Sequence, residues 1–239
     1  IVTQDNTWLF PCAIWRDESG SVPAERHGLE NEQFSNVYAS TDEGKTIVLR
    51  GHADVPMRSF DEHMIVQKKD GTLWMLVRTF DGLGESFSSD GGFTWTPGHK
   101  SHIDNPCSRF FIRRLKSGRL LMINHYNFDQ RIDLDDIMHQ GNVKRWKGRS
   151  HLTAMLSEDD GETWPYTLLL DERDEVSYPD AKEADDGFIY VCYDHARVTE
   201  REILMARFTE EEILNGKLSN PESKLRVLVN KALGQPDVE

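Results

Sequence analysis

The sequence has few cysteines, and their number and spacing exclude two kinds of stabilised small fold. Only three are present, Cys12, Cys107 and Cys192, and they lie far apart in the chain. An odd number of widely spaced cysteines fits neither a disulfide framework nor the paired ligand spacing of a metal site. Because they fall mostly in apolar, strand-like runs, we expect them to be buried free thiols.

Positive charge is also scarce. The chain has 28 Lys and Arg residues against 41 Asp and Glu residues, which gives a formal net charge of −13 at pH 7. Such a chain lacks the basic surface that binds phosphate backbones, so nucleic acid is not an expected partner. An anionic ligand would need a local basic pocket.

Long apolar runs are missing as well. No stretch approaches the ~20 apolar residues of a membrane-spanning helix, so no membrane-spanning segment is expected. The sequence begins at Ile1 with neither an initiator Met nor a signal peptide, and we expect it to be a piece of a longer chain. Its 239 residues suffice for one large all-β domain or two ordinary domains.

What the sequence does contain is an eight-residue pattern, SxDxGxTW, in three copies. We name the copies in chain order: the first box is Ser40–Ile47, the second box is Ser88–Trp95 and the third box is Ser157–Trp164. In the first box Ile47 replaces the Trp. The Asp carboxylate can accept nearby backbone N–H groups, and the Gly allows a positive φ, so each box predicts a tight turn closed by a large apolar ring.

The boxes recur within runs of alternating strands, which favours one domain of stacked four-stranded blades over residues 1–239. Turns at Asp70-Gly71, Ser117-Gly118 and Asp186-Gly187 separate strand pairs. The sequence predicts four blades, at approximately residues 1–55, 56–100, 101–172 and 173–239. The first blade has a shortened opening strand. The last has no box and carries a short helix that Thr209 caps, with Glu212 three residues on.

A loop insertion interrupts the third blade. Asp42 and Asp90 are 48 residues apart, whereas Asp90 and Asp159 are 69 apart. The excess falls between His125 and Arg149, where strand alternation is weak. Long loops in compact domains are often functional, so Arg131, His139 and Trp146 in this insertion are candidates for substrate contact, although a purely structural excursion fits as well.

Strand alternation sorts the polar residues that flank the strands. In a blade whose strands alternate in direction, the boxes and the Asp-Gly turns share one face. On the other face we expect Asp61, Glu62 and His63, at the start of one strand, and Arg78, at the end of the next. The same face also receives Arg149, Tyr178, Asp194 and His195 from the later blades. Each alone reads as a surface residue, but together they predict a polar mouth.

The residues of this mouth and the boxes resemble the Asp-box sialidase (neuraminidase) family. The most specific segments are RSHLTAMLSEDDGETW, residues 149–164, and SYPDAKEADDGFIYVCYD, residues 177–194. The resemblance implies an all-β, six-bladed propeller of which about four blades lie in this chain. It further implies a retaining exo-glycosidase that hydrolyses terminal sialic acid or a related 2-keto-3-deoxy sugar acid from glycans. For a bacterial member it implies a periplasmic or secreted enzyme.

By position, the resemblance implies a role for each residue of the mouth. Tyr178 matches the nucleophile and Glu62 its partner base. Arg78 and Arg149 match two of the three arginines that grip the substrate carboxylate. Asp61, His63, Asp194, His195 and Trp146 are further expected substrate contacts, and no metal or organic cofactor is implied.

The sequence departs from the family pattern at several points. Nothing in residues 1–62 matches the family's first arginine motif or its acid/base aspartate. Pro179 follows Tyr178 where a Ser is more usual, and Asp194 stands where a Glu is often found. Two alternatives therefore stay open, a carbohydrate-binding propeller without catalysis and a lyase that acts on uronate polysaccharides with a Tyr base.

Overall fold

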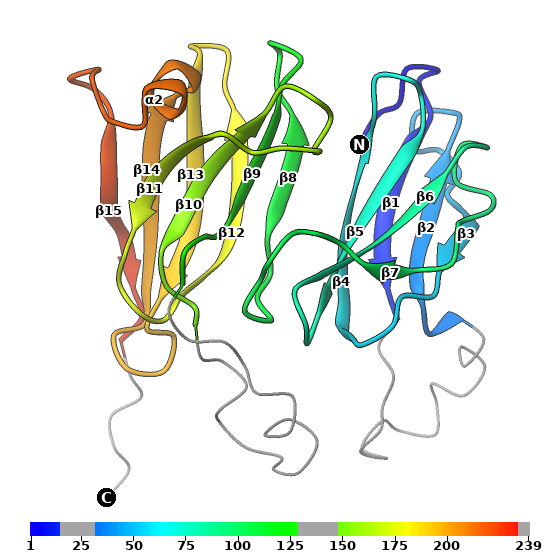
Figure 1. Cartoon of the computed structure of the whole chain (residues 1–239), viewed down its shortest axis with the longest axis horizontal. Coiled ribbons are helices and arrows are strands. Elements are labelled where there is room, and N and C mark those ends of the chain that lie inside the picture. Colours follow the sequence, from blue (N-terminus) through cyan, green and yellow to red (C-terminus); the bar gives the residue numbers. More distant parts are fainter. Residues whose placement is uncertain (15–31, 129–147, 234–239) are drawn as a thin grey trace, which may run out of the picture. The chain divides into compact units, whose positions relative to one another are not determined.

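A computed structural model of the chain describes residues 1–14, 32–128 and 148–233 (Figure 1). The chain forms two compact units, Ile1–Cys107 and Ser108–Glu239. Each unit holds two antiparallel sheets, and the strands that pair within a sheet follow one another in the sequence. Such up-and-down sheets are propeller blades, so the prediction of an all-β propeller with four blades in this chain is confirmed.

The first unit contains a three-stranded and a four-stranded blade. Val2 adds a single bridge to Trp8 in the first of these, where the sequence predicted a shortened strand. The strands of the first blade are β1 (Trp8–Ala13), β2 (Ser35–Ser40) and β3 (Val48–Ala53). Those of the second are β4 (Arg58–Gln67), β5 (Leu73–Thr79), β6 (Leu83–Ser88) and β7 (His99–Lys100).

The second unit contains two four-stranded blades. The strands of the third blade are β8 (Phe111–Arg114), β9 (Leu120–His125), β10 (Leu152–Ser157) and β11 (Tyr166–Asp171). Those of the fourth are β12 (Val176–Glu183), β13 (Phe188–His195), β14 (Glu202–Thr209) and β15 (Lys224–Lys231). How the chain divides into domains stays a prediction.

Burial follows the position of each strand in its blade. Every residue of β5, β9 and β10 is buried, as expected for central strands covered on both faces. In the first unit, apolar side chains from β1, β2, β4 and β5 form one core cluster that includes Leu9, Val37, Ile65 and Met75. These cores fix the strand ends, from which the polar residues of interest project.

The three boxes share one hydrogen-bond pattern. In the third box, Asp159 accepts from the backbone N–H of Thr163 at 2.9 Å and from its hydroxyl at 2.6 Å, while Ser157 Oγ accepts from Gly161 N at 2.8 Å. The bonds from the Thr163 side chain and backbone lower the pKa of Asp159 to about 2. Asp160 and Gly161 adopt positive φ values of 58° and 94°, a region that glycine adopts without a Cβ clash and that Asp adopts more readily than most residues. The predicted turn mechanism is confirmed.

The large apolar ring predicted to close each turn is present in the second box, and in the first box a different residue supplies it. Trp95 of the second box packs against the core cluster of the first unit, and its Nε1 donates to Gly92 O at 3.1 Å. Ile47 of the first box is 53% exposed and does not close the turn. The ring of Trp8 instead lies over Gly44 of that box, within 3.3 Å of the place where a Cβ would stand.

The cysteine expectation is wrong in part. All three cysteines are free thiols, but only Cys107 is buried, whereas Cys12 and Cys192 are exposed. Cys192 lies in β13 between the buried residues Val191 and Tyr193, and strand alternation turns it to the outer face. An apolar run therefore did not guarantee burial at its middle residue.

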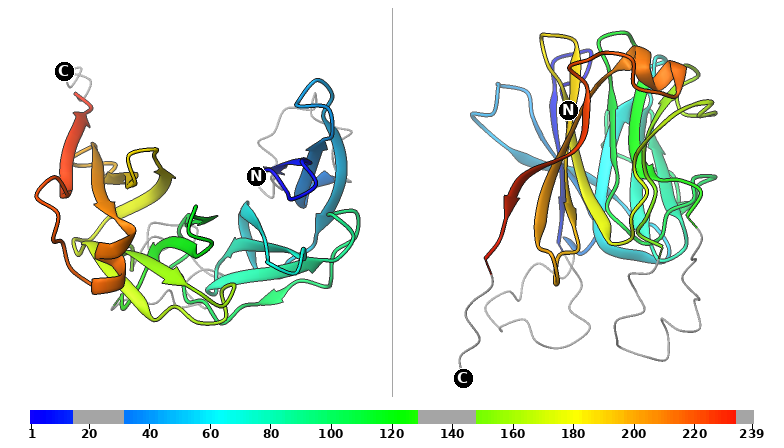
Figure 2. Two further views of the ribbon diagram at one scale, coloured as in Figure 1. Left: turned by 90° about the horizontal axis from the view of Figure 1, so that it is seen from above. Right: turned by 90° about the vertical axis from the view of Figure 1, so that its left-hand side faces the viewer.

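The predicted helix is α2 (Glu210–Asn215), which packs against β11 and β10 (Figure 2). Thr209 caps it, and the reciprocal hydrogen bonds of a capping box with Glu212 are both present. It occupies the connection between β14 and β15, where the other blades carry a box. In the part of the chain that the structure describes, no helix is long and apolar enough to cross a membrane.

Glu212 is a buried carboxylate that makes stability depend on pH. Burial alone would raise its pKa, but hydrogen bonds from Ser223, Asn220, Ser219 and Thr209 lower the pKa to about 2. An unfolded Glu has a pKa of about 4.3. The folded pKa is the lower one, so the ionised carboxylate stabilises the fold above pH ~4.3 and this contribution is lost as the pH falls toward 2.

We expect Glu212→Gln to remove most of this pH dependence. The contribution at neutral pH is on the order of 3 kcal/mol, and the amide NH2 would face backbone donors that need an acceptor. Urea unfolding at a series of pH values between 2 and 7 measures the effect, with the exposed neighbour Glu211→Gln as the matched control. An unchanged pH profile in Glu212→Gln would contradict the assignment.

Candidate functional site

Tyr178 has an unusual backbone. In the pairing of β12 with β13, Ser177 lies opposite Asp194 and Asp180 lies opposite Cys192, so the register shifts at Tyr178 and Pro179. Tyr178 has a φ of 55°, in the left-handed region that a bulky residue rarely adopts. A bulge with a strained, half-buried aromatic residue is a common way of aiming a functional side chain.

Two guanidinium groups face the Tyr178 ring. The Cζ atom of Arg149 lies 5.8 Å from the ring centroid, and that of Arg197 lies 4.1 Å from it. Arg149 is 9% exposed and precedes β10, and its carbonyl accepts from Val176 N, at the start of β12, at 3.1 Å. The second unit thus places two cations on one phenol ring.

Asp194 holds this arrangement together. One of its oxygens accepts from Ser177 Oγ at 2.5 Å, and the other accepts from Arg197 Nε at 2.9 Å and from Arg197 Nη2. Burial alone would lower the pKa of Arg197, but the hydrogen bonds to Asp194 and the Tyr178 ring raise it. His195, the next residue along β13, pairs through Nδ1 with Glu202 at 2.9 Å.

His125 contacts the backbone next to Arg149. Its Nδ1 lies 2.8 Å from the carbonyl of Ser150, the residue that follows Arg149. Complete burial and the nearby Arg149 charge lower the pKa of His125 to about 4, which keeps the ring neutral at physiological pH. The neutral ring donates to the Ser150 carbonyl, which fixes the backbone beside Arg149.

In the first unit, Arg78 and Glu62 form an ion pair. Arg78 is completely buried, and its Nη1 donates to Glu62 Oε2 at 2.6 Å, while its Nη2 lies 3.7 Å from Cys107 Sγ. The sequence predicted that these two residues share a mouth but not that they pair. Tyr178 and Arg149 belong to the second unit, so a shared site of all four residues stays a prediction.

The remaining predicted contacts are distributed as follows. Asp61, Glu62 and His63 do not open a strand, because β4 begins at Arg58 and its register with β5 shifts between Arg58 and His63. His63 is buried, and its Nε2 lies 2.8 Å from the carbonyl of Asn36 in β2. Three predicted contacts lie outside the described residues, namely Arg131, His139 and Trp146.

Sequence reasoning missed Arg197. It follows Asp194 by three residues and His195 by two, in the connection between β13 and β14. Strand alternation places only residues at strand ends, whereas this side chain turns back from the connection to the Tyr178 ring. The available signal was that Arg197 is a basic residue close enough to Asp194 in the sequence for their side chains to form a hydrogen bond.

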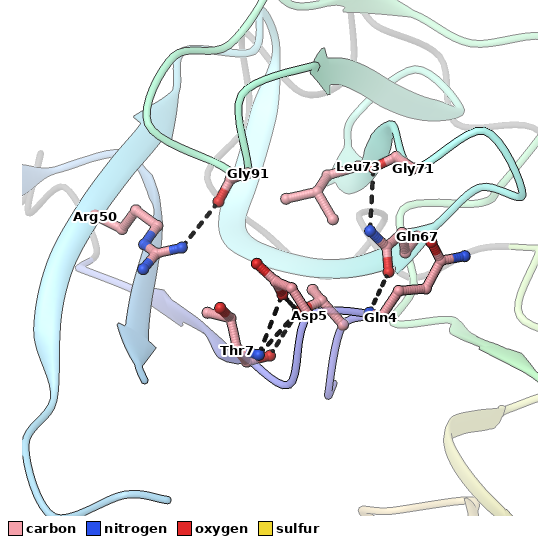
Figure 3. A pocket seen from close by; sticks show the side chains of 9 residues that line it. Gln4, Asp5, Thr7, Arg50, Gln67, Gly71, Leu73 and Gly91 are labelled. Carbon is pink, nitrogen blue, oxygen red and sulfur yellow. Dashed lines mark hydrogen bonds between the residues drawn. The ribbon is translucent and has the colours of Figure 1, made fainter. Parts of the chain in front are cut away.

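A separate hollow lies in the first unit. It is next to Leu73 at the start of β5, whereas Arg78 lies near the other end of that strand (Figure 3). It has a volume of about 250 Å³, and several of its polar groups bond to one another. Gln67 accepts from Gln4 N at 2.8 Å and donates to Gly71 O at 3.1 Å, and Arg50 donates to Gly91 O at 3.3 Å. Because it lies beside the Asp70-Gly71 turn and the second box, it does not belong to the predicted mouth.

The blades, the boxes and the arginine-flanked tyrosine define an Asp-box β-propeller. The family model described as BNR repeat-like domain matches residues 1–191, and the chain belongs to this family. No curated protein matches the sequence.

Solved structures share the fold. A Hadza microbial sialidase is 20% identical, with a TM-score of 0.56, over 81% of this chain and 34% of that one. A protein of unknown function from Dyadobacter fermentans is 19% identical, with a TM-score of 0.54, over 81% and 47%. The intramolecular trans-sialidase from Ruminococcus gnavus is 19% identical, with a TM-score of 0.52, over 77% and 39%. The chain therefore has a sialidase-type propeller fold and spans less than half of each of these proteins.

Proposed function

We propose that the protein is a retaining exo-glycosidase that hydrolyses terminal sialic acid, or a related 2-keto-3-deoxy sugar acid, from glycans. The observation that carries this proposal is Tyr178, which is held in a strained backbone conformation under two guanidinium groups. The sialidase-type fold and the names of the similar structures support the substrate class.

The substrate chemistry explains why a tyrosine would be used. A 2-keto sugar acid carries its carboxylate on the anomeric carbon, which repels an anionic Asp or Glu nucleophile but not a neutral phenol. Sialidases with a Tyr nucleophile are a known exception to the use of two carboxylates. The phenol oxygen attacks the anomeric carbon, the aglycone leaves, and water then displaces the phenol, so two inversions give net retention.

We assign Glu62 as the base for Tyr178, and Arg78 with Arg149 as ligands of the substrate carboxylate. In the first unit, Glu62 and Arg78 are already paired at 2.6 Å. The assignment therefore needs Glu62 to reach Tyr178 within about 3.2 Å when substrate is bound.

The Glu62–Arg78 pair favours a second candidate function, a carbohydrate-binding propeller without catalysis. If Glu62 serves only to neutralise Arg78, Tyr178 has no assigned base and the arginines bind an acidic sugar without turnover. The two candidates share the ligand class and differ in the role of one carboxylate.

Product analysis of the intact protein with sialylated oligosaccharides separates the candidates. The proposal expects free sugar released with retention at the anomeric carbon, read by NMR early in the reaction. Binding without release would favour the binding propeller. An unsaturated product that absorbs in the ultraviolet, formed from a uronate polysaccharide, would identify a lyase instead.

We expect Arg149→Lys to weaken binding of an acidic sugar by about tenfold or more, while binding of its carboxamide changes little. A guanidinium can donate two parallel hydrogen bonds to a carboxylate, and an ammonium cannot. Calorimetric titration with both ligands measures the difference. An equal loss for the acid and the amide would show that Arg149 has only a structural role.

A further inference from the structure

Arg197 is held in a fixed place beside Tyr178. Its Nε and Nη2 both donate to Asp194 Oδ2, and the other Asp194 oxygen accepts from Ser177 Oγ at 2.5 Å. Ser177 directly precedes Tyr178 at the bulge in β12. The Asp194 carboxylate therefore links Arg197 to the strained segment that carries Tyr178.

Two arginines lie close together at the Tyr178 ring. Arg149 and Arg197 both face the ring, and Asp194 pairs with Arg197. Guanidinium groups placed close together are what a carboxylate ligand requires on a chain with a formal net charge of −13. Since both Cζ atoms are measured to the same ring centroid, they lie no farther apart than the sum of the two distances, 9.9 Å.

Arg197 is also partly open to solvent. Its side chain is 53% exposed, while Nε and Nη2 donate to Asp194 and the guanidinium also interacts with the Tyr178 side chain. A partly exposed, pre-oriented guanidinium loses little side-chain freedom when it accepts a carboxylate ligand.

We propose that Arg197 is a second arginine of the second unit that binds, together with Arg149, the carboxylate of an acidic sugar lying on the Tyr178 ring. This inference rests on the proposed substrate class and adds a residue that the family resemblance did not supply. It makes the anion site a property of the second unit, with Asp194 as the positioning residue that holds Arg197.

The test compares charged and neutral ligands in Arg197→Gln and Arg197→Lys. The probes are N-acetylneuraminic acid, galacturonic acid and the carboxamide of each, titrated calorimetrically into the intact protein. We expect Arg197→Gln to weaken acid binding by on the order of tenfold while the amide is bound as before, and Arg197→Lys to retain part of the preference for the acid. Arg201→Gln is the matched control, because this exposed arginine lies on the same connection.

The outcomes separate this inference from the proposed function. If the wild type binds galacturonic acid but not N-acetylneuraminic acid, and Arg197→Gln removes that binding, the sialic-acid proposal fails and the anion site stands. Equal weakening of the acid and the amide, or no difference between Arg197→Gln and Arg201→Gln, overturns the anion site. Absence of binding of both acids to the wild type overturns it too. Thermal unfolding of each variant identifies a loss of binding that reflects misfolding.

Discussion

Tyr178→Phe is expected to lose turnover on the order of a thousandfold or more, with little change in substrate binding. Phe keeps the ring that lies under Arg149 and Arg197 and removes only the oxygen that would attack the anomeric carbon. The loss should therefore appear in kcat and leave the dissociation constant of an acidic sugar nearly unchanged. Steady-state kinetics and calorimetric binding on the same preparation separate the two effects.

A second tyrosine of the same blade provides the control. Tyr190 lies in β13 and its hydroxyl donates to Asp186 at 3.1 Å, beside the Asp186-Gly187 turn at the other end of the blade. Tyr190→Phe makes the same chemical change away from the arginines and should keep full turnover. Turnover of Tyr178→Phe close to that of the wild type would refute the nucleophile role.

Asp171→Ala is expected to destabilise the protein by about 3 kcal/mol or more. Asp171 is completely buried at the end of β11 and accepts from Arg173 Nη2 at 2.6 Å and from Tyr193 OH, in β13, at 3.1 Å. Burial alone would raise the pKa of Asp171, but the hydrogen bonds from Arg173 outweigh burial and lower it. Removing the carboxylate leaves a buried hydroxyl and a guanidinium without their shared acceptor.

The exposed Asp174→Ala, in the segment between β11 and β12, is the matched control and should change stability by less than about 0.5 kcal/mol. Denaturant unfolding measures both variants. A change in Asp171→Ala no larger than in Asp174→Ala would mean that the buried network contributes little beyond its own desolvation cost.

The blades could be predicted because their signals are local. The eight residues of a box contain both the carboxylate and its donors, so reading Asp159 and Thr163 together is enough to predict the turn. The capping box of α2 has the same property, since Thr209 and Glu212 are three residues apart. The apolar runs did not show which residues of a strand face outward, and so Cys12 and Cys192 were assigned wrongly.

The candidate site could be predicted only in part. Strand alternation assigned Arg149, Tyr178 and Asp194 to one face, and the structure brings these residues of the second unit together. It could not supply Arg197, because a connection between strands has no fixed direction. Nor could it reveal that Glu62 pairs with Arg78, since partner choice between nearby charges depends on side-chain geometry that a sequence pattern does not contain.

The locality of the boxes has a consequence for how the chain acquires its fold. Each box carboxylate is bonded to donors no more than four residues away, and each blade pairs strands that follow one another in the sequence. Contacts of short sequence separation cost little chain entropy to close and form quickly. A blade can therefore be completed soon after its last strand leaves the ribosome, without waiting for the residues of later blades.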